Sequence, residues 1–192
     1  MIVDERTVSY IQSLEPDDSP VCMEIAREAR RAGIPIIRRE TASLLKTLVA
    51  AKQPERILEV GTAVGYSALL MSEAMPAGCS ITTIEKYEKR IPQARKNFAL
   101  AGKSEQILLL EGDAAQILPE LEGFYDFIFM DAAKGQYLHF LPMVLRLMPP
   151  GGVLVSDNVL QDGDIIESRY AVTRRNRTIH TRMRDYLYQL KH

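Results

Sequence analysis

Four acidic residues each follow an apolar run in this 192-residue sequence, a position from which carboxylates can bind cations or sugar hydroxyls. They are Glu85, Asp113, Asp131 and Asp157. Parallel strands end at one edge of a sheet, where open α/β sheets bind their ligands, so we expect these carboxylates to lie near one another. A single acid after a strand is commonly the N-cap of the next helix, and for Asp113 alone this interpretation is at least as good. Four such acids together favour a functional site.

Asp131, Asp157 and Asn158 would bring three oxygen ligands together from two strand ends. Oxygen ligands without histidine or cysteine suit Mg²⁺ or another hard divalent cation such as Mn²⁺. Lys134 lies one helical turn after Asp131, and a lysine kept partly dry beside a cation loses basicity and can act as a general base. The alternatives remain open here: Asp131 caps a helix, Asp157 and Asn158 form only a turn, and Lys134 is a solvated lysine.

The segment ILEVGTAVGYS, residues 57–67, predicts a strand, a tight turn and a helix. Its glycines, Gly61 and Gly65, are spaced G-x-x-x-G, unlike the dinucleotide motif G-x-G-x-x-G, and no Lys-Ser/Thr pair follows as in a P-loop. Glu59 before the turn suits a cationic ligand better than an anionic one. Glu85, twenty residues after Gly65, stands where a carboxylate binds ribose hydroxyls. A nucleoside with positive charge suggests S-adenosylmethionine, while a nicotinamide or a purely structural role remains open.

Strands and helices alternate along most of the chain and would position these residues. Solid apolar runs such as 107–110 and 127–130, alternating with amphipathic helices, predict an α/β fold with a parallel sheet covered on both faces. Helices are expected at 4–14, 21–32, 39–51, 65–75, 87–101, 113–121, 135–147 and near 173–190, and strands at 56–60, 80–85, 106–111, 125–130 and 152–156. One domain of residues 1–192 is expected, with a helical N-terminal cap (1–51), a core (52–160) and a basic C-terminal helix (161–192).

Composition is that of an ordinary globular protein, with 46% hydrophobic and 26% charged residues and a net charge of −1. No signal peptide and no apolar run of membrane length is evident, so we expect a cytoplasmic protein without a membrane partner. Cys22 and Cys79 have no metal or redox spacing, which fits a reducing compartment.

The C-terminal region is basic, since residues 169–192 contain seven lysines and arginines and one acid. Tyrosines lie among the arginines, and proteins that bind RNA loops combine phosphate contacts from arginine with base stacking on aromatic rings. The alternative is a solvated helix face, because apolar residues at helical spacing supply a buried stripe. These residues are Val172, Ile179, Met183, Leu187 and Leu190.

The sequence resembles the metal-dependent class I O-methyltransferases, the group that contains catechol and caffeoyl-coenzyme A methyltransferases. Residues 34–160 resemble most closely the bacterial tRNA 5-hydroxyuridine methyltransferases, through KQPERILEVGTAVGYSALLMSEAMP, FIFMDAAKGQY and GGVLVSDNVL. The resemblance implies a Rossmann-like fold and contacts to S-adenosylmethionine from Ile37, Glu59, Gly61, Ser67, Glu85, Asp113, Ala114 and Asp131. It also implies that Asp131, Asp157 and Asn158 bind the metal, and that Lys134 and Asp131 take part in catalysis.

A bound cation lowers the pKa of a coordinated hydroxyl and orients it for methyl transfer. The resemblance therefore implies an acceptor with two adjacent oxygens that can chelate one cation. The first expectation is 5-hydroxyuridine at the wobble position of the tRNA anticodon loop, converted to 5-methoxyuridine. A small catechol-like or coenzyme A-linked phenol is the second. A non-catalytic RNA- or partner-binding module on the same fold is the third. The expected RNA contacts are Arg38, Arg39, Arg174, Arg175 and Arg177.

The resemblance is incomplete at the C-terminal end. Members of this group commonly form homodimers and continue past the last helix into two further strands, one of which carries a glycine-aspartate-glycine turn. This sequence ends at His192. We therefore expect the strand at 152–156 to be a hydrophobic sheet edge that needs cover, and we expect a homodimer.

Overall fold

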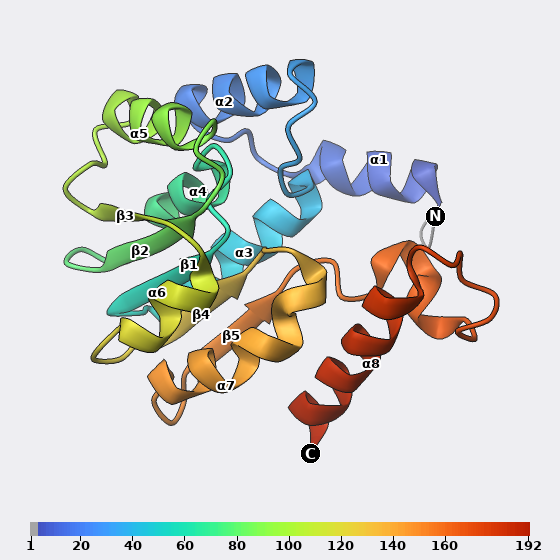
Figure 1. Ribbon diagram of the computed structural model, residues 1–192. Helices are drawn as coiled ribbons and strands as arrows, with labels where there is room; N and C mark the ends of the chain where they lie inside the picture. Colours follow the sequence, from blue (N-terminus) through green and yellow to red (C-terminus); the bar gives the residue numbers. More distant parts are fainter. Residues whose placement is uncertain (1–3) are drawn as a thin grey trace.

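Five parallel strands form one sheet in the order β3-β2-β1-β4-β5 in the computed structural model, which describes residues 4–192 (Figure 1). The strands are β1 (Arg56–Val60), β2 (Ser80–Glu85), β3 (Ile107–Glu111), β4 (Phe127–Met130) and β5 (Val153–Ser156). The predicted α/β fold with a parallel sheet is confirmed. Strand order reverses between β1 and β4, and such a crevice is where open α/β sheets bind ligands.

Helices cover both faces of the sheet, as the solid apolar strands predicted (Figure 1). They are α1 (Glu5–Leu14), α2 (Pro20–Arg31), α3 (Arg39–Lys52), α4 (Tyr66–Ala74), α5 (Ile91–Leu100), α6 (Ala114–Glu120), α7 (Tyr137–Leu147) and α8 (Arg177–Lys191), with 3₁₀ turns η1 (Lys134–Gln136) and η2 (Gln161–Ile166). Neighbouring strand residues alternate between the two cores: Ile57 packs with α2 to α5, whereas Leu58 packs with α6 to α8.

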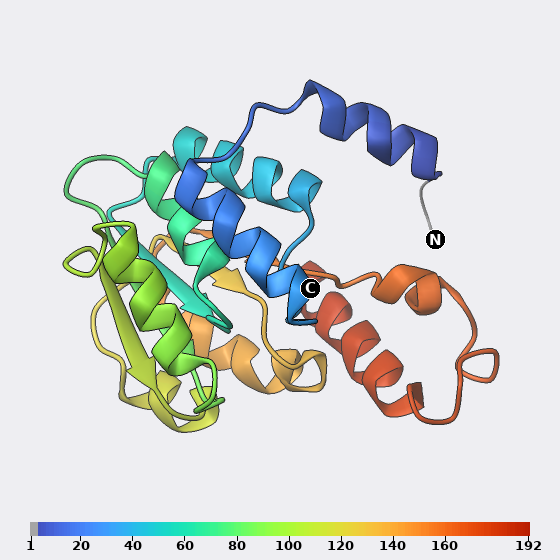
Figure 2. The same cartoon turned by 90° about the horizontal axis from the view of Figure 1, so that it is seen from above.

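The N-terminal helices all form, but α1 buries none of its side chains and lies at the periphery against α3 (Figure 2). None of the helices in the described range 4–192 is both long and apolar enough to cross a membrane.

Several predicted boundaries were wrong by a few residues. The helix expected from 87 begins at Ile91, and the helix expected near 173 begins at Arg177. The helix expected from 135 opens as the 3₁₀ turn η1. The turn η2 was not predicted, because its residues Asp162 and Gly163 adopt positive φ angles that no periodicity signals.

β5 lies at the edge of the sheet in the part of the chain that is described. Its side chains are half-buried, and the Tyr186 hydroxyl of α8 lies 2.5 Å from the Ser156 hydroxyl at its end. Helix α8 packs against α7 and η1, so the basic C-terminal helix is joined to the layer beside β5.

The turn after β1 depends on Gly61, whose φ is +108°. A Cβ at this position would lie 2.2 Å from the carbonyl oxygen of Asp131. The glycine therefore lets the β1–α4 loop lie directly against the loop that follows β4. Gly65 has the same constraint, because a Cβ there would lie 2.5 Å from the Phe98 ring.

We predict that Gly61→Ala lowers the unfolding free energy by about 3–5 kcal/mol, since backbone strain and a clash with rigid backbone each cost roughly 1–3 kcal/mol. Gly78→Ala is the matched control, because Gly78 also has a positive φ (+88°) but nothing within 4 Å of the added Cβ. Urea denaturation measures both. Equal losses for the two variants would contradict the close approach of the two loops.

Candidate active site

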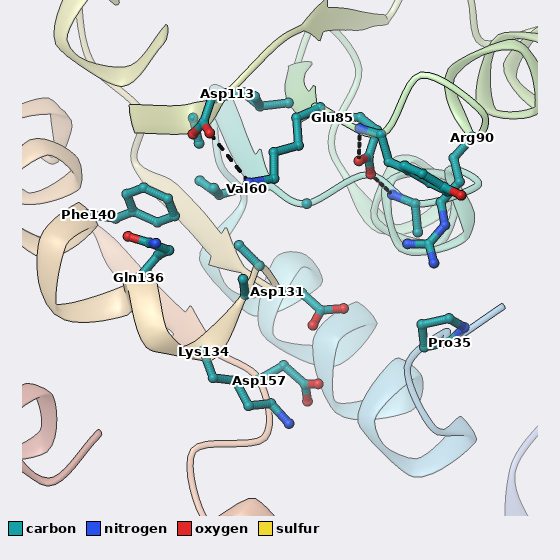
Figure 3. A pocket seen from close by; sticks show the side chains of 18 of the residues that line it. Pro35, Val60, Glu85, Arg90, Asp113, Asp131, Lys134, Gln136, Phe140 and Asp157 are labelled. Atoms are coloured by element: carbon teal, nitrogen blue, oxygen red, sulfur yellow. Dashed lines mark hydrogen bonds and ion pairs between the residues drawn. The ribbon is translucent and has the colours of Figure 1, made fainter. Parts of the chain in front are cut away.

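The four acidic residues that follow the strands line one cavity of about 450 Å³ at the carboxyl edge of the sheet (Figure 3). This volume lies within the range of small-molecule sites, about 300–1,000 Å³. The strands bring Glu85, Asp113, Asp131 and Asp157 together from positions up to 72 residues apart in the sequence. Their individual roles stay predictions.

Glu85 is held rigidly at the end of β2. One carboxylate oxygen accepts a hydrogen bond from the Tyr87 N–H and the other from the Ala63 N–H, both at 2.7 Å. A carboxylate oxygen has a second lone pair, so Glu85 can still accept bonds from ligand hydroxyls. The carboxylate can therefore accept further hydroxyl donors without moving, and its contact with a ribose stays a prediction.

Asp113 is the N-cap of α6, and its carboxylate accepts the Ala115 N–H at 2.9 Å. This bond, more than the nearby Lys86 ammonium at 3.4 Å, lowers the pKa of Asp113. The helix-cap interpretation of Asp113 is thus correct, and the residue also lines the cavity together with Ala114.

The cavity walls between these acids are apolar, which suits the flat base of a nucleoside. They include Ile37, Val60, Ile84, Ala114 and Phe140. Ile37 comes from the segment between α2 and α3 and is buried. Anchored carboxylates beside apolar walls fit S-adenosylmethionine, which combines ribose hydroxyls, an adenine and a cationic sulfur.

Glu59 and Ser67 are buried and do not line the cavity, whereas Gly61 does. The Ser67 and Thr83 hydroxyls each donate to Glu59 at 2.5 Å, and the Thr62 hydroxyl lies 2.5 Å from that of Thr83. Burial raises the pKa of Glu59 to about 7, although the hydrogen bonds from Ser67 and Thr83 act to lower it. Direct contact of Glu59 and Ser67 with the cofactor stays a prediction, and the structure gives them a second role in bracing β1, β2 and α4.

Asp131, Asp157, Asn158 and Lys134 line the other half of the same cavity. In Figure 3 both aspartate side chains and Lys134 extend into one space. Burial, followed by the charge of Asp157, raises the pKa of Asp131 to about 6, and Lys134 opposes the rise. Burial also raises the pKa of Asp157, with Lys134 and the Asn158 N–H opposing it.

The two carboxylates form a donor set that suits a hard cation. None of the ion pairs among residues 4–192 involves Asp131 or Asp157. No group of three His, Cys, Asp or Glu side chains suited to a metal occurs in that range, so the amide of Asn158 would be the third ligand. Two unpaired carboxylates and an amide fit Mg²⁺ or Mn²⁺. Metal binding at this point stays a prediction.

Three of the five arginines expected to contact RNA are engaged within the chain. Arg38 pairs with Asp162 at 3.1 Å, and Arg39 binds the carboxylate of Asp17 and the carbonyl oxygens of residues 15 and 16. Arg177 donates to the carbonyl oxygens of Val172 and Tyr170. Arg174 and Arg175 are exposed in the loop before α8.

Several residues that line the cavity were not predicted from the sequence: Lys86, Tyr87, Arg90, Gln136 and Phe140. The Arg90 guanidinium lies 5.1 Å from the centre of the Tyr87 ring. Their only signal was proximity in the sequence to Glu85 or to Lys134. Phe140 lies on α7 at helical spacing, which predicts a core position equally well.

Comparison with known proteins agrees with this geometry. A sequence model of the O-methyltransferase family matches residues 12–189. The catechol O-methyltransferase of Niastella koreensis is 34% identical over 169 residues, which are 85% of this chain and 76% of that protein. The chain spans between 48% and 76% of the length of the first curated relatives it matches.

Two solved structures share the fold closely. The O-methyltransferase TomG of Streptomyces achromogenes, crystallised in complex with SAM, is 28% identical with a TM-score of 0.86, over 100% of this chain and 87% of that one. An O-methyltransferase of Bacillus cereus in complex with SAH is 28% identical with a TM-score of 0.82, over 95% of this chain and 83% of that one. The predicted Rossmann-like architecture is thus confirmed.

We predict that raising the pH from 5 to 8 lowers the unfolding free energy of the wild type relative to Glu59→Gln by about 3 kcal/mol. The unfolded chain releases the Glu59 proton near pH 4.5, whereas the folded chain holds it up to about pH 7. Stability from this group is therefore complete below pH 4.5 and declines as the pH rises to 7.

Urea denaturation at several pH values measures this difference. Glu88→Gln, at an exposed position, serves as the control and should follow the wild type at every pH. A constant difference between wild type and Glu59→Gln would show that Glu59 is ionised throughout.

Proposed function

We propose that this chain, which belongs to the S-adenosylmethionine-dependent O-methyltransferase family of the catechol and caffeoyl-coenzyme A type, methylates 5-hydroxyuridine at the wobble position of the tRNA anticodon with the help of a divalent cation. One observation supports this most directly. The Asp131, Asp157, Asn158 and Lys134 group shares a cavity with the anchored carboxylate of Glu85.

The chemistry requires an acceptor oxygen in line with the methyl group that S-adenosylmethionine carries on its cationic sulfur. A divalent cation, when bound, lowers the pKa of an acceptor hydroxyl and orients it. Glu85 would hold the ribose of the cofactor, and the apolar walls would exclude water from the reacting atoms. The negative charges of Asp131 and Asp157 would attract both the cation and the cationic cofactor.

In its neutral amine form, Lys134 would take the proton from the acceptor hydroxyl and become an ammonium. Its place in η1, directly after the loop that carries Asp131, keeps it on the metal half of the cavity. Its positive charge opposes the rise in the pKa of both aspartates, so the Lys134 side chain lies within electrostatic reach of the two carboxylates. A 5-hydroxyl beside a 4-carbonyl offers the two adjacent oxygens that this arrangement suits.

Two exposed arginines support an RNA acceptor. Arg174 and Arg175 are exposed in the loop that precedes α8, where they would contact RNA phosphates. RNA binding through such contacts weakens as the salt concentration rises. Arg38 and Arg39 would contribute less, since intramolecular ion pairs hold them.

A small catechol-like phenol is the second candidate acceptor. The relative from Niastella koreensis is a catechol O-methyltransferase, which favours this candidate. A catechol also carries two adjacent oxygens and needs no arginine loop.

We predict that the purified protein converts 5-hydroxyuridine to 5-methoxyuridine in tRNA in the presence of S-adenosylmethionine and Mn²⁺, and that EDTA abolishes the reaction. Mass spectrometry of tRNA nucleosides measures the product. The double variant Arg174→Ala/Arg175→Ala should lose most of this activity and bind tRNA with a shallower salt dependence, yet methylate a small catechol as the wild type does.

Arg27→Ala/Arg31→Ala removes the same charge from exposed positions of α2 and is the matched control. Turnover of a catechol with no turnover of tRNA would support the second candidate. RNA binding with no turnover of either acceptor would support a non-catalytic binding module.

A further inference from the structure

Tyr137, the first residue of α7, lies buried behind the metal half of the cavity with an exposed fraction of 0%. Its hydroxyl donates to the carbonyl oxygen of Met130 at 2.9 Å and lies 3.3 Å from the carbonyl oxygen of Asp157. One hydroxyl thus lies between the ends of two adjacent strands, β4 and β5.

These two carbonyl groups belong to the peptide units that carry the predicted ligands. The Met130 carbonyl is part of the peptide that leads into Asp131. The Asp157 carbonyl is part of the peptide that joins Asp157 to Asn158. Because a peptide unit is planar, holding its carbonyl oxygen restricts the orientation of the residues on both sides.

Few other contacts could fix this corner of the sheet. The Asp157 N–H donates to Met130 at 2.9 Å, and the Asp131 N–H donates to Val60 at 3.0 Å. In the described part of the chain, however, β5 pairs only with β4 and over only four residues. The peptide after Asp157 also turns sharply, since Asn158 has a φ of +53°.

The ring of Tyr137 is itself held in place by α8. The Tyr186 ring meets it edge-on, with centroids 5.5 Å apart and planes at 68°. The Tyr186 hydroxyl lies 2.5 Å from the Ser156 hydroxyl, one residue before Asp157. Two buried tyrosines therefore support the strand end that carries two of the three predicted ligands.

We propose that Tyr137 is a positioning residue, whose hydroxyl fixes the separation of Asp131 from Asp157 and Asn158 so that their oxygens can share one cation. This inference rests on the proposed metal dependence. Residues that orient metal ligands typically contribute 10–100-fold to metal affinity or activity, and the indirect action through backbone places Tyr137 near the lower end.

Tyr125 offers a matched control for the loss of a buried tyrosine hydroxyl. It is 2% exposed, and its hydroxyl lies 3.3 Å from that of Thr82 in the same core. It does not line the cavity and contacts no predicted ligand. Removing either hydroxyl should lower stability by a similar amount, so that only a difference in metal binding distinguishes a positioning role.

The test is calorimetric titration of Mn²⁺ into wild type, Tyr137→Phe and Tyr125→Phe, each saturated with S-adenosylhomocysteine. We expect about tenfold weaker Mn²⁺ binding for Tyr137→Phe and a change below about twofold for Tyr125→Phe. Affinity for S-adenosylhomocysteine should stay the same in all three. Wild-type Mn²⁺ affinity in Tyr137→Phe would overturn the positioning role and leave the proposed function intact.

A wild type that binds S-adenosylhomocysteine but not Mn²⁺ would instead contradict the proposed metal dependence, and the positioning role with it. Should Tyr137→Phe fail to fold, Tyr186→Leu gives the second measurement, because it removes both the ring that holds Tyr137 and the contact to Ser156. We expect it to weaken Mn²⁺ binding in the same direction by a smaller factor, and unchanged binding there would overturn the proposal.

Discussion

Hydrogen bonds between the parallel strands continue past the last residues of β3, β4 and β5 and fix the loops that follow these strands. The Asp131 N–H donates to Val60, the Asp157 N–H to Met130, and the Gly112 N–H to Glu85. Asp131 and Asp157 are thus themselves in register with the neighbouring strand, and Asp113 comes directly after Gly112. Gly61 makes this possible at the centre, because a larger residue would collide with the backbone of Asp131. The positions of Asp113, Asp131 and Asp157 follow from this continuation of the ladder, whereas Glu85 is the last residue of β2 itself.

The result is a cavity with an excess of negative charge. Burial and the charge of Asp157 raise the pKa of Asp131, and the charges of Asp131 and Glu85 add to the burial that raises the pKa of Glu59. Lys134 offsets part of this charge on the metal side. A cationic cofactor and a divalent cation would offset more of it. The electrostatics therefore agree with the membership of the chain in the S-adenosylmethionine-dependent O-methyltransferase family, whose sequence model matches residues 12–189.

Much of the fold and part of the site could be predicted from the sequence. The apolar runs predicted every strand, and the acid after each of four strands predicted the edge where the cavity lies, because parallel strands share their carboxyl ends. The burial of Glu59 and Ser67 outside the cavity lining could not be predicted from the sequence. It depends on the hydroxyl of Thr62, in the turn after β1, and on that of Thr83, in β2. The ion pairs of Arg38 and Arg39 depend on loops whose positive φ angles or irregular course leave no periodicity. The link from Tyr137 to two strand ends required coordinates, because a buried tyrosine on a helix is equally typical of plain core packing.

We propose that oxygens of Asp131, Asp157 and Asn158 meet at one cation beside the methyl donor. A crystal structure of the protein grown with S-adenosylhomocysteine and Mn²⁺, with diffraction data collected for the anomalous signal of manganese, tests it most directly. We expect one anomalous peak in contact with all three side chains, next to a cofactor whose ribose is bound by Glu85. Cofactor density in the cavity with no anomalous peak between the two aspartates would contradict the account.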